Sequence, residues 1–566
     1  MYILGISAFY HDSAAALIKD GNVVAAVEEE RLSRIKHDNG FPEKAAEYCL
    51  AKEGISINDV EHVVFYEKPF LKFERLLMSS FGTFPSSCRL FREAMMSMLK
   101  EKLWVKELIQ SKLKYKKEVL FVEHHISHAA SSFFCSPFEE AAILTADGVG
   151  EWTTTTLGIG RGNDIKLLKE IRFPHSLGLL YSAFTAFLGF EVNEGEYKVM
   201  GMAPYGEPKY LDKVYKLLKV NDDGSYWLDM QYFSYHYSPD QTFNGNFTKL
   251  FGDPKGKQAD VVDKYYADIA ASIQRVTEEV LLKMTRYLYK ETGLKKLCLA
   301  GGVALNSVAN GRIMRESGFE DIFIQPAAGD SGGAVGAALY VYHSLLGKKR
   351  QYIMEHAYLG PESRHEEIEA FLKGNNIPFQ SFEQEELLKT VAESLTQGKV
   401  VGWFQGRTEW GPRALGDRSI LADPRKEEMK DIVNAKIKFR ELFRPFAPSV
   451  LVEKAEDFFE LPEAERRFPA RFMLYVTPVK EEKRAQIPAI THVDGSARPQ
   501  TVFKELNPLY YGLIEEFAHL TGVPLLLNTS FNLKGEPIVC TPQDAFNTFS
   551  KSGLDLLVLG NYVVKK

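Results

Sequence analysis

Two histidines four residues apart, His124 and His128 in the segment HHISH, are the side chains of the first half that are best suited to chemistry. Residues i and i+4 lie on one face of a helix, so both imidazoles could reach one ion, whereas His125 would point elsewhere. A bare pair of this spacing more often packs or caps at a helix start. Two acids favour a metal site instead: Asp147 ends the apolar run AAILTAD, and Asp330 lies in the glycine-rich turn AAGDSGG. Imidazole and carboxylate ligands together suit iron, zinc or manganese, and ligand type alone does not choose among them.

Glycine-rich turns between a predicted strand and a predicted helix offer a second kind of site. The segments KLCLAGGVALNSVANGRI and DIFIQPAAGDSGGAVGAAL both have this pattern, and free N–H groups at a helix N-terminus bind phosphates. In the first segment, Gly301 and Gly302 could let the backbone approach a bound ligand closely. A Gly-Gly pair before a helix is weak evidence by itself.

The second half carries its candidate chemistry in basic residues. GPRALGDRSI, KFRELFRPF and SARPQ contain Arg413, Arg418, Lys438, Arg440, Arg444 and Arg498. Each cation alone is more often a solvated surface charge. Because they are clustered beside glycine and proline turns in an acidic protein, they indicate a pocket for several phosphates, with which arginine forms bidentate hydrogen bonds.

The N-terminal segment adds two candidates, His11 just after the first predicted strand and Lys36 in RIKHDNG. An imidazole titrates near neutral pH and can act as a general base with little tuning, although a turn histidine can also simply bond to a backbone carbonyl. Lys36 could hold a phosphate or orient a substrate. Alone, an exposed lysine there would carry no information.

Composition excludes several classes of protein. The chain has 566 residues, which predicts three or more folding units, and its hydrophobic content of 45%, charged content of 25% and net charge of -6 give no basic excess for nucleic acid. The five cysteines are scattered without a C-x-x-C pair, which argues against a disulfide framework and a cysteine zinc site. We find no signal-peptide pattern and no apolar run of about 18 residues, so the expected location is the cytoplasm, with no membrane partner.

The elements that must position these residues follow from the apolar pattern. MYILGISAFY, SAAALIKDG and NVVAAVEEER predict three strands, with a hairpin turn at Asp20 and Gly21. A basic helical stretch from about 70 to 117 precedes strands at VLFV, AAILTAD and TTTTLGIG. We interpret the first half as two duplicated α/β lobes around a nucleotide cleft, although no sequence repeat is visible. The predicted boundaries are residues 1–346, a polar junction at 347–367, and a second α/β unit at 368–566.

Longer motifs resemble a known family. HHISH, TADGVGEW, GEYKVMGMAPYG, AGGVALNSVANGRI and AAGDSGGAVGAAL resemble the N-terminal half of the NodU/CmcH family of O-carbamoyltransferases. GRTEWGPRALGDRSI, FRPFAPSVL and LLLNTSFNLKGEPI resemble its C-terminal half, and the motifs occur in family order over nearly the whole chain. The resemblance implies an α/β fold, with a duplicated ASKHA-type (Kae-like) nucleotide-binding domain followed by a YrdC-like α/β domain.

The same resemblance implies a reaction and a role for each candidate. Carbamoyl phosphate and ATP would give carbamoyl adenylate, whose carbamoyl group passes to a hydroxyl of a small-molecule acceptor such as a sugar, an aminoglycoside or another natural product, as in antibiotic biosynthesis. His124, His128, Asp147 and Asp330 would bind Fe(II) or another divalent metal, and His11 would be the general base. Lys36 would bind phosphate or acceptor. Gly301, Gly302, Asn306 and Asn310 would bind the adenylate, and Arg413, Lys438, Arg444, Arg498 and Asn528 would bind ATP, with Mg²⁺, and carbamoyl phosphate.

Some alternatives remain open at this stage. A sugar or acid kinase of the same nucleotide-binding superfamily would use the same first half, but it needs neither the metal ligands nor the second unit. A hydrogenase-maturation carbamoyltransferase would carry cysteine zinc fingers and an acylphosphatase domain, and neither pattern is present. The segment from about 72 to 114 is expected to shape the acceptor pocket, where it either packs on the core or holds an anionic acceptor. No nucleic-acid partner is expected, and a homodimer is the default only because dimers are the commonest soluble oligomers.

Overall fold

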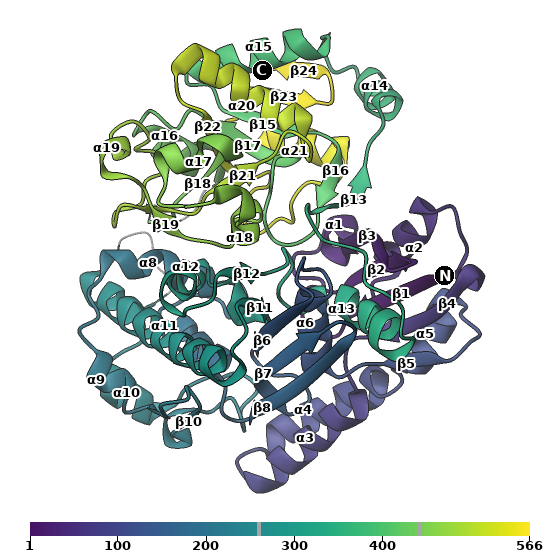
Figure 1. The fold of residues 1–566 in the computed structure, drawn as a ribbon, viewed down its shortest axis with the longest axis vertical. Helices are drawn as coiled ribbons and strands as arrows, with labels where there is room; N and C mark the ends of the chain where they lie inside the picture. The colour runs from purple at the N-terminus through teal and green to yellow at the C-terminus, as the bar shows by residue number, and fades with distance from the viewer. Residues whose placement is uncertain (257–261, 439–440, 442) are drawn as a thin grey trace. The chain divides into compact units, whose positions relative to one another are not determined.

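The structure is a computed structural model that describes residues 1–256, 262–438, 441 and 443–566 (Figure 1). Its chain divides into two units: unit 1 consists of Met1–Glu29 and Asn39–Ile353, and unit 2 consists of Glu30–Asp38 and Met354–Lys566. The short segment Glu30–Asp38 is held in unit 2 by arginines, since Arg31 donates to the carbonyl of Gly411 at 2.8 Å. Arg440, a member of the predicted basic cluster, lies outside the described residues.

The first sheet of unit 1 begins with the predicted hairpins. Its strands are β1 (Tyr2–Ser7), β2 (Ala14–Lys19), β3 (Asn22–Glu28), β4 (Val60–Phe65) and β5 (Val119–Phe121). The order is β3-β2-β1-β4-β5, antiparallel from β3 to β1 and parallel from β1 to β5. Asp20 and Gly21 both have positive φ, 48° and 86°, as a two-residue type I′ hairpin requires, and the predicted turn is confirmed.

The second sheet of unit 1 repeats this topology. Its strands are β6 (Glu140–Ala146), β7 (Thr153–Arg161), β8 (Asp164–Arg172), β11 (Lys296–Ala300) and β12 (Asp321–Phe323). The order is β8-β7-β6-β11-β12, with antiparallel pairing from β8 to β6 and parallel pairing from β6 to β12. Strand for strand, β6 corresponds to β1 and β12 to β5. The predicted duplication is therefore confirmed by topology, without any visible sequence repeat.

Equivalent helices follow the last strand of each sheet and pack against each other. They are α6 (His124–Phe133) after β5 and α13 (Gly332–Tyr340) after β12. A Cβ on Gly336 would lie 1.8 Å from the carbonyl oxygen of Ser127, so only glycine permits this closeness. The two helices thus bring the ends of both sheets together.

The remaining elements of unit 1 surround the two sheets. They are α2 (Glu43–Lys52), α3 (Pro69–Gly82), α4 (Cys88–Ser97), α5 (Val105–Leu113), α7 (Leu177–Phe187), α8 (Glu196–Met202), α9 (Leu211–Val214), α10 (Gly245–Phe251), α11 (Lys264–Thr292), α12 (Ser307–Glu316), β9 (Leu218–Val220) and β10 (Tyr226–Leu228). The predicted basic helical stretch corresponds to α3, α4 and α5. Among the described residues, no helix is both long and apolar enough to cross a membrane.

Unit 2 is a mixed α/β unit built on one eight-stranded sheet. Its order is β14-β24-β23-β15-β17-β22-β18-β21, formed by β14 (Gln380–Ser381), β15 (Val401–Phe404), β17 (Arg418–Ala422), β18 (Ala447–Leu451), β21 (Gln500–Val502), β22 (Leu525–Ser530), β23 (Leu556–Leu559) and β24 (Tyr562–Lys565). Its main helices are α14 (His365–Gly374), α15 (Gln384–Thr396), α16 (Met429–Val433), α20 (Pro508–Thr521) and α21 (Pro542–Lys551). β22 lies inside this sheet and is buried over most of its length, which makes it a rigid support for side chains at its end.

Candidate functional site

The structure brings the four predicted metal ligands together in unit 1. His124 and His128 project from the first turns of α6, Asp147 follows β6, and Asp330 lies between β12 and α13. Nε2 of His124 is 3.1 Å from Oδ2 of Asp147 and 3.7 Å from Oδ1 of Asp330. Nε2 of His128 is 3.7 Å and 3.6 Å from the same two atoms. All four side chains are buried, and one ligand atom from each lies within 4.8 Å of the others.

The donor set fits a divalent cation. Two imidazole nitrogens and two carboxylate oxygens form a mixed set that iron, zinc and manganese all accept. Oδ1 of Asp330 is buried and accepts no hydrogen bond from the described residues, although Tyr66 donates to its Oδ2 at 3.4 Å. The two Nε2 atoms of His124 and His128 are only 3.0 Å apart. This geometry suits nitrogens that face a common ion.

The two buried acids of this cluster favour positive charge at its centre. Burial disfavours a charged imidazole, but the nearby carboxylates of Asp147 and Asp330 outweigh it and raise the pKa of His128 to about 9. Burial likewise works against an ionised Asp147, yet the two histidines hold its pKa well below its usual range. Without an ion, a proton on His128 offsets part of the negative charge of the acids. A bound cation would replace that proton, so metal binding would release it.

The predicted adenylate loop touches the same cluster. The N–H of Gly302 donates to Oδ1 of Asp147 at 2.9 Å. Gly301 has a φ of 91°, and a Cβ there would lie 2.2 Å from the carbonyl oxygen of Ala146. This loop therefore packs directly on the end of β6, where any side chain at Gly301 would collide with the backbone.

Asn306 and Asn310 shape that loop through their own amides. Asn306 caps α12 by accepting a hydrogen bond from the N–H of Ala309 at 3.1 Å, and it exchanges hydrogen bonds with Gln274. Asn310 donates to the carbonyl of Ala304 at 2.8 Å. Both amides serve the fold of the loop, and their predicted contact with adenylate stays a prediction.

His11 lies in the loop between β1 and β2, where its side chain pairs with that of its neighbour Asp12. Its Nδ1 is 2.9 Å from Oδ2 of Asp12, and the two side chains are 23% and 29% exposed. Burial lowers the pKa of the imidazole, but the hydrogen bond and charge of Asp12 outweigh it and raise that pKa to about 9. Lys36 belongs to unit 2, where its Nζ lies 3.3 Å from the carboxylate of Glu30.

In unit 2, Asn528 lies within β22, and Lys438 reaches the end of that strand from the helical turn Asn434–Lys438. The Nδ2 of Asn528 donates to the carbonyl of Ala414, the hydroxyl of Ser449 and the amide oxygen of Gln500, at 3.2, 3.0 and 3.1 Å. Its Oδ1 is buried and has no hydrogen-bond partner among the described residues. Nζ of Lys438 donates to the carbonyl of Ser530 and, at 3.0 and 2.8 Å, to the carbonyl and side-chain oxygens of Asn532.

Three of the predicted arginines of unit 2 are close in sequence to residues that contact or pair with Asn528. Arg413 precedes Ala414, Arg498 lies two residues before Gln500, and Arg444 leads into β18, whose Ala447 pairs with Asn528. All three arginines are partly exposed, although Nε of Arg413 and of Arg498 is buried and Arg444 lies 3.6 Å from the carboxylate of Glu441.

Arg418 behaves differently from the other cations of its motif. It is fully buried, its guanidinium stacks 3.7 Å from the ring centroid of Phe404, and it donates to the carbonyls of Gln405 and, at 3.2 Å, Gly406. Grouping it with phosphate ligands on the basis of its motif was therefore wrong, because the side chain is fully buried and both terminal nitrogens of its guanidinium donate to backbone carbonyls.

Two buried acids escaped the sequence analysis. Oε1 of Glu409 accepts hydrogen bonds from the N–H groups of Leu415, Asp417 and Arg418, at 2.9, 2.9 and 3.0 Å, and so folds the loop that carries the predicted arginine at 413. Glu151, at the end of the TADGVGEW motif, plays a similar part in unit 1. A lone glutamate beside a glycine-rich loop is the only signal that could have drawn attention to either residue.

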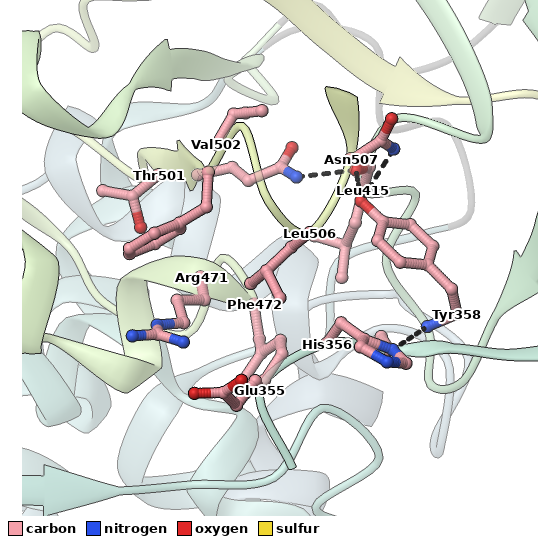
Figure 2. Close-up of a pocket in the computed structure, with 13 residues that line it drawn as sticks. Glu355, His356, Tyr358, Leu415, Arg471, Phe472, Thr501, Val502, Leu506 and Asn507 are labelled. Atoms are coloured by element: carbon pink, nitrogen blue, oxygen red, sulfur yellow. Dashed lines mark hydrogen bonds between the residues drawn. The ribbon is translucent and has the colours of Figure 1, made fainter. Parts of the chain in front are cut away.

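A small pocket of unit 2 shares Gln500 with the hydrogen-bond cluster of Asn528, Ser449 and Gln500 (Figure 2). Glu355, His356, Tyr358, Arg471 and Asn507 line it together with Gln500. Gln500 connects the pocket to this cluster, because its amide donates to the carbonyl of Leu415 at 2.6 Å and accepts from Asn528. The sequence analysis selected none of these lining residues.

Comparison with known proteins covers nearly the whole chain. A family model described as Carbamoyltransferase N-terminus matches residues 2–339, and one described as Carbamoyltransferase C-terminus matches residues 392–566. An uncharacterized protein of Synechocystis sp. is 52% identical, with 100% of this chain and 97% of that protein covered. The nodulation protein NolNO of Sinorhizobium fredii is 41% identical, over 99% of this chain and 79% of its own length.

Solved structures resemble the chain only distantly. HypF from T. kodakarensis is 14% identical with a TM-score of 0.32, covering 61% of this chain and 48% of HypF. Component A of the Acidaminococcus fermentans (R)-2-hydroxyglutaryl-CoA dehydratase is 15% identical with a TM-score of 0.34, covering 61% and 99%. These values are too low to inform the assignment, which depends on the sequence matches.

Proposed function

Because the chain belongs to the carbamoyltransferase family and is an enzyme of that kind, we propose that it is an ATP-dependent O-carbamoyltransferase with one reaction site in each unit. The observation that carries the proposal is the carboxylate of Asp147. One of its oxygens faces the two histidines and the other accepts a hydrogen bond from the Gly302 loop, so a metal and an adenylate phosphate could share one end of β6.

The activation step is assigned to residues 368–566. Water cleaves carbamoyl phosphate into carbamate and phosphate. A carbamate oxygen then attacks the α-phosphorus of ATP, the bond between the α- and β-phosphates breaks, and pyrophosphate leaves. Arg413, Arg444 and Arg498, with Lys438, Asn528 and Mg²⁺, would neutralise the phosphates during this chemistry.

The transfer step is assigned to residues 1–346. The acceptor hydroxyl attacks the carbamoyl carbon, AMP leaves, and the hydroxyl proton passes to Nε2 of His11, whose Nδ1 is held by Asp12. His124, His128, Asp147 and Asp330 would hold Fe(II) or another divalent metal, which when bound supplies positive charge to the adenylate phosphate. Gly301, Gly302, Asn306 and Asn310 would shape the adenosine side, and Lys36 stays a candidate for binding phosphate or acceptor.

We assign the acceptor to small molecules that carry a hydroxyl, such as a sugar, an aminoglycoside or another natural product. The cytoplasm is the proposed location, since both ATP and carbamoyl phosphate are made there. A homodimer is the default assembly. A sugar or acid kinase is the competing function, because the duplicated topology of unit 1 alone would serve it equally well.

A coupled assay for pyrophosphate and phosphate release separates the two functions. It uses ATP, Mg²⁺ and carbamoyl phosphate without acceptor, on the wild type, on Arg444→Ala and on the control Arg466→Ala, whose guanidinium pairs with Glu463 on the surface. We expect pyrophosphate release that requires carbamoyl phosphate, is lost in Arg444→Ala and persists in the control. No pyrophosphate under any metal condition, with ADP formed from ATP and a sugar or acid substrate, would establish the kinase instead.

A further inference from the structure

Glu151 is a buried carboxylate placed at the start of the helix that carries both metal-site histidines. It ends the loop between β6 and β7 and is only 6% exposed. Its Oε1 accepts hydrogen bonds from the N–H of Lys68 at 2.8 Å and from the N–H of His124 at 3.0 Å, and its Oε2 lies 3.2 Å from the same N–H of His124. Both oxygens of Glu151 thus contact the backbone N–H of a predicted ligand.

This contact supplies a cap that α6 lacks. The first N–H groups of a helix have no partner within the helix, and the N-cap residue of α6, Glu123, makes no side-chain capping bond. Glu151 provides the acceptor from 27 residues further along the chain. Its negative charge also lies at the positive end of the helix dipole, which stabilises this end of the helix.

The imidazoles depend on that backbone more than metal-bound histidines usually do. A histidine at a metal is normally oriented by a hydrogen bond from its second ring nitrogen. Here the Nδ1 atoms of His124 and His128 are buried and have no hydrogen-bond partner among the described residues. Their orientation therefore comes from the path of α6 and from packing, including that of the His124 ring on Gly150, where a Cβ would lie 2.9 Å from the ring.

We propose that Glu151 is a positioning residue for the metal centre, which holds the first turn of α6 so that both histidines face Asp147 and Asp330. The short loop from Asp147 to Glu151 then supplies a ligand, a packing surface and a helix cap. The proposal rests on the metal role assigned to the cluster in the proposed function.

The test is cobalt binding by the full-length protein after removal of metal, in the wild type, Glu151→Gln and Glu29→Gln. Glu29 is a matched control, because it is also buried and accepts the N–H groups of Lys44 and Ala45, at 3.3 and 2.8 Å, at the start of α2. We expect Glu151→Gln to weaken Co²⁺ binding about tenfold or more and to alter the visible absorption of the bound ion. Glu29→Gln should lose comparable thermal stability but keep the affinity and the spectrum of the wild type.

The outcomes separate this inference from the proposed function. If the wild type binds no Co²⁺, the metal site itself is wrong and the role of Glu151 falls with it. If the wild type binds and Glu151→Gln binds with equal affinity and the same spectrum, the metal site stands and the positioning role is overturned. Should Glu151→Gln fail to fold, Glu151→Asp, which keeps the charge on a shorter side chain, is judged by the same affinity and spectrum.

Discussion

The two halves of unit 1 share one sheet topology, but their equivalent loops carry different chemistry. The β1–β2 loop holds His11 and Asp12, whose side chains are 23% and 29% exposed. The corresponding β6–β7 loop holds Asp147 and Glu151, which are both buried. The ends of the last strands differ in residue type alone, with two histidines after β5 and Asp330 after β12, all of them buried.

This difference shows how a duplicated fold can supply one asymmetric site. Duplication brings four loop positions to the same edge of the two sheets, and the residue types at those positions then set the role of each loop. A group that must exchange a proton with an acceptor has to remain accessible, whereas ligands that hold an ion benefit from burial, which strengthens their interaction with it. The roles that we propose for the exposed pair and for the buried acids agree with this rule.

The largest effect is expected from His128→Ala, which removes one of the predicted ligands from the buried cluster. We expect metal affinity to fall roughly 100-fold or more and carbamoyl transfer to disappear, while acceptor-independent pyrophosphate release continues. Metal content by mass spectrometry and the separate half-reactions provide the measurement. His125→Ala on the same helix is the control, since His125 bonds to the hydroxyl of Thr145 at 2.6 Å and should not affect the ion. Equal metal loss in both variants would contradict the assignment.

A smaller and more selective effect is expected from His11→Asn in the exposed loop. Loss of a general base slows the step it serves by about 10²–10⁴-fold. We therefore expect transfer to a hydroxyl acceptor to fall within this range, with pyrophosphate release and Co²⁺ affinity unchanged. Single-turnover transfer from preformed carbamoyl adenylate measures the step directly. If pyrophosphate release fell by the same factor, His11 would not be specific to transfer.

Asp12→Asn should move the pH dependence of transfer rather than abolish it. His11 acts as a base only when neutral, so the rate should rise with pH through the pKa of about 9 that Asp12, Asp330 and Asp147 help to maintain. Removing the charge of Asp12 lowers that pKa, so the rising limb should shift to lower pH by about one unit. A bound cation would offset the charges of Asp330 and Asp147. It would therefore shift the pH profiles of the wild type and of Asp12→Asn in the same direction. Profiles from pH 5.5 to 10 test this, and identical limbs in the two proteins would exclude His11 as the titrating base.

Much of this arrangement could be predicted because its signals are local. The hairpin at Asp20 and Gly21, the helical spacing of His124 and His128, and an acid after an apolar strand can all be read within a few residues. The structure brings the four predicted ligands together, and their binding of a metal stays a prediction. The duplication had no sequence repeat to support it and became visible only in the strand order.

The contacts that escaped prediction are those made across long stretches of chain. Glu151 meets backbone N–H groups 27 and 83 residues away, and nothing in an isolated glutamate shows which amides it will reach. Glu409 was overlooked for the same reason. For Arg418 the error was the reverse, because a function was predicted for a residue that the fold buries. A motif cannot show that an aromatic ring and several carbonyls will enclose one of its cations.

The smallest effect on metal binding is expected at the contact between α6 and α13, where the two halves of unit 1 pack against each other. Gly336→Ala would place a Cβ 1.8 Å from the carbonyl oxygen of Ser127 and push α13 away from α6. Overpacking of this kind costs about 1–3 kcal/mol of unfolding free energy, whereas a small separation of the helices should lower Co²⁺ affinity less than tenfold. Denaturant unfolding and cobalt titration measure the two quantities. Gly82→Ala at the end of α3, where a Cβ meets nothing within 4 Å, should leave both unchanged or raise stability slightly. If Gly336→Ala matched that control, the close approach of α6 and α13 would not be what holds the two halves of the site together.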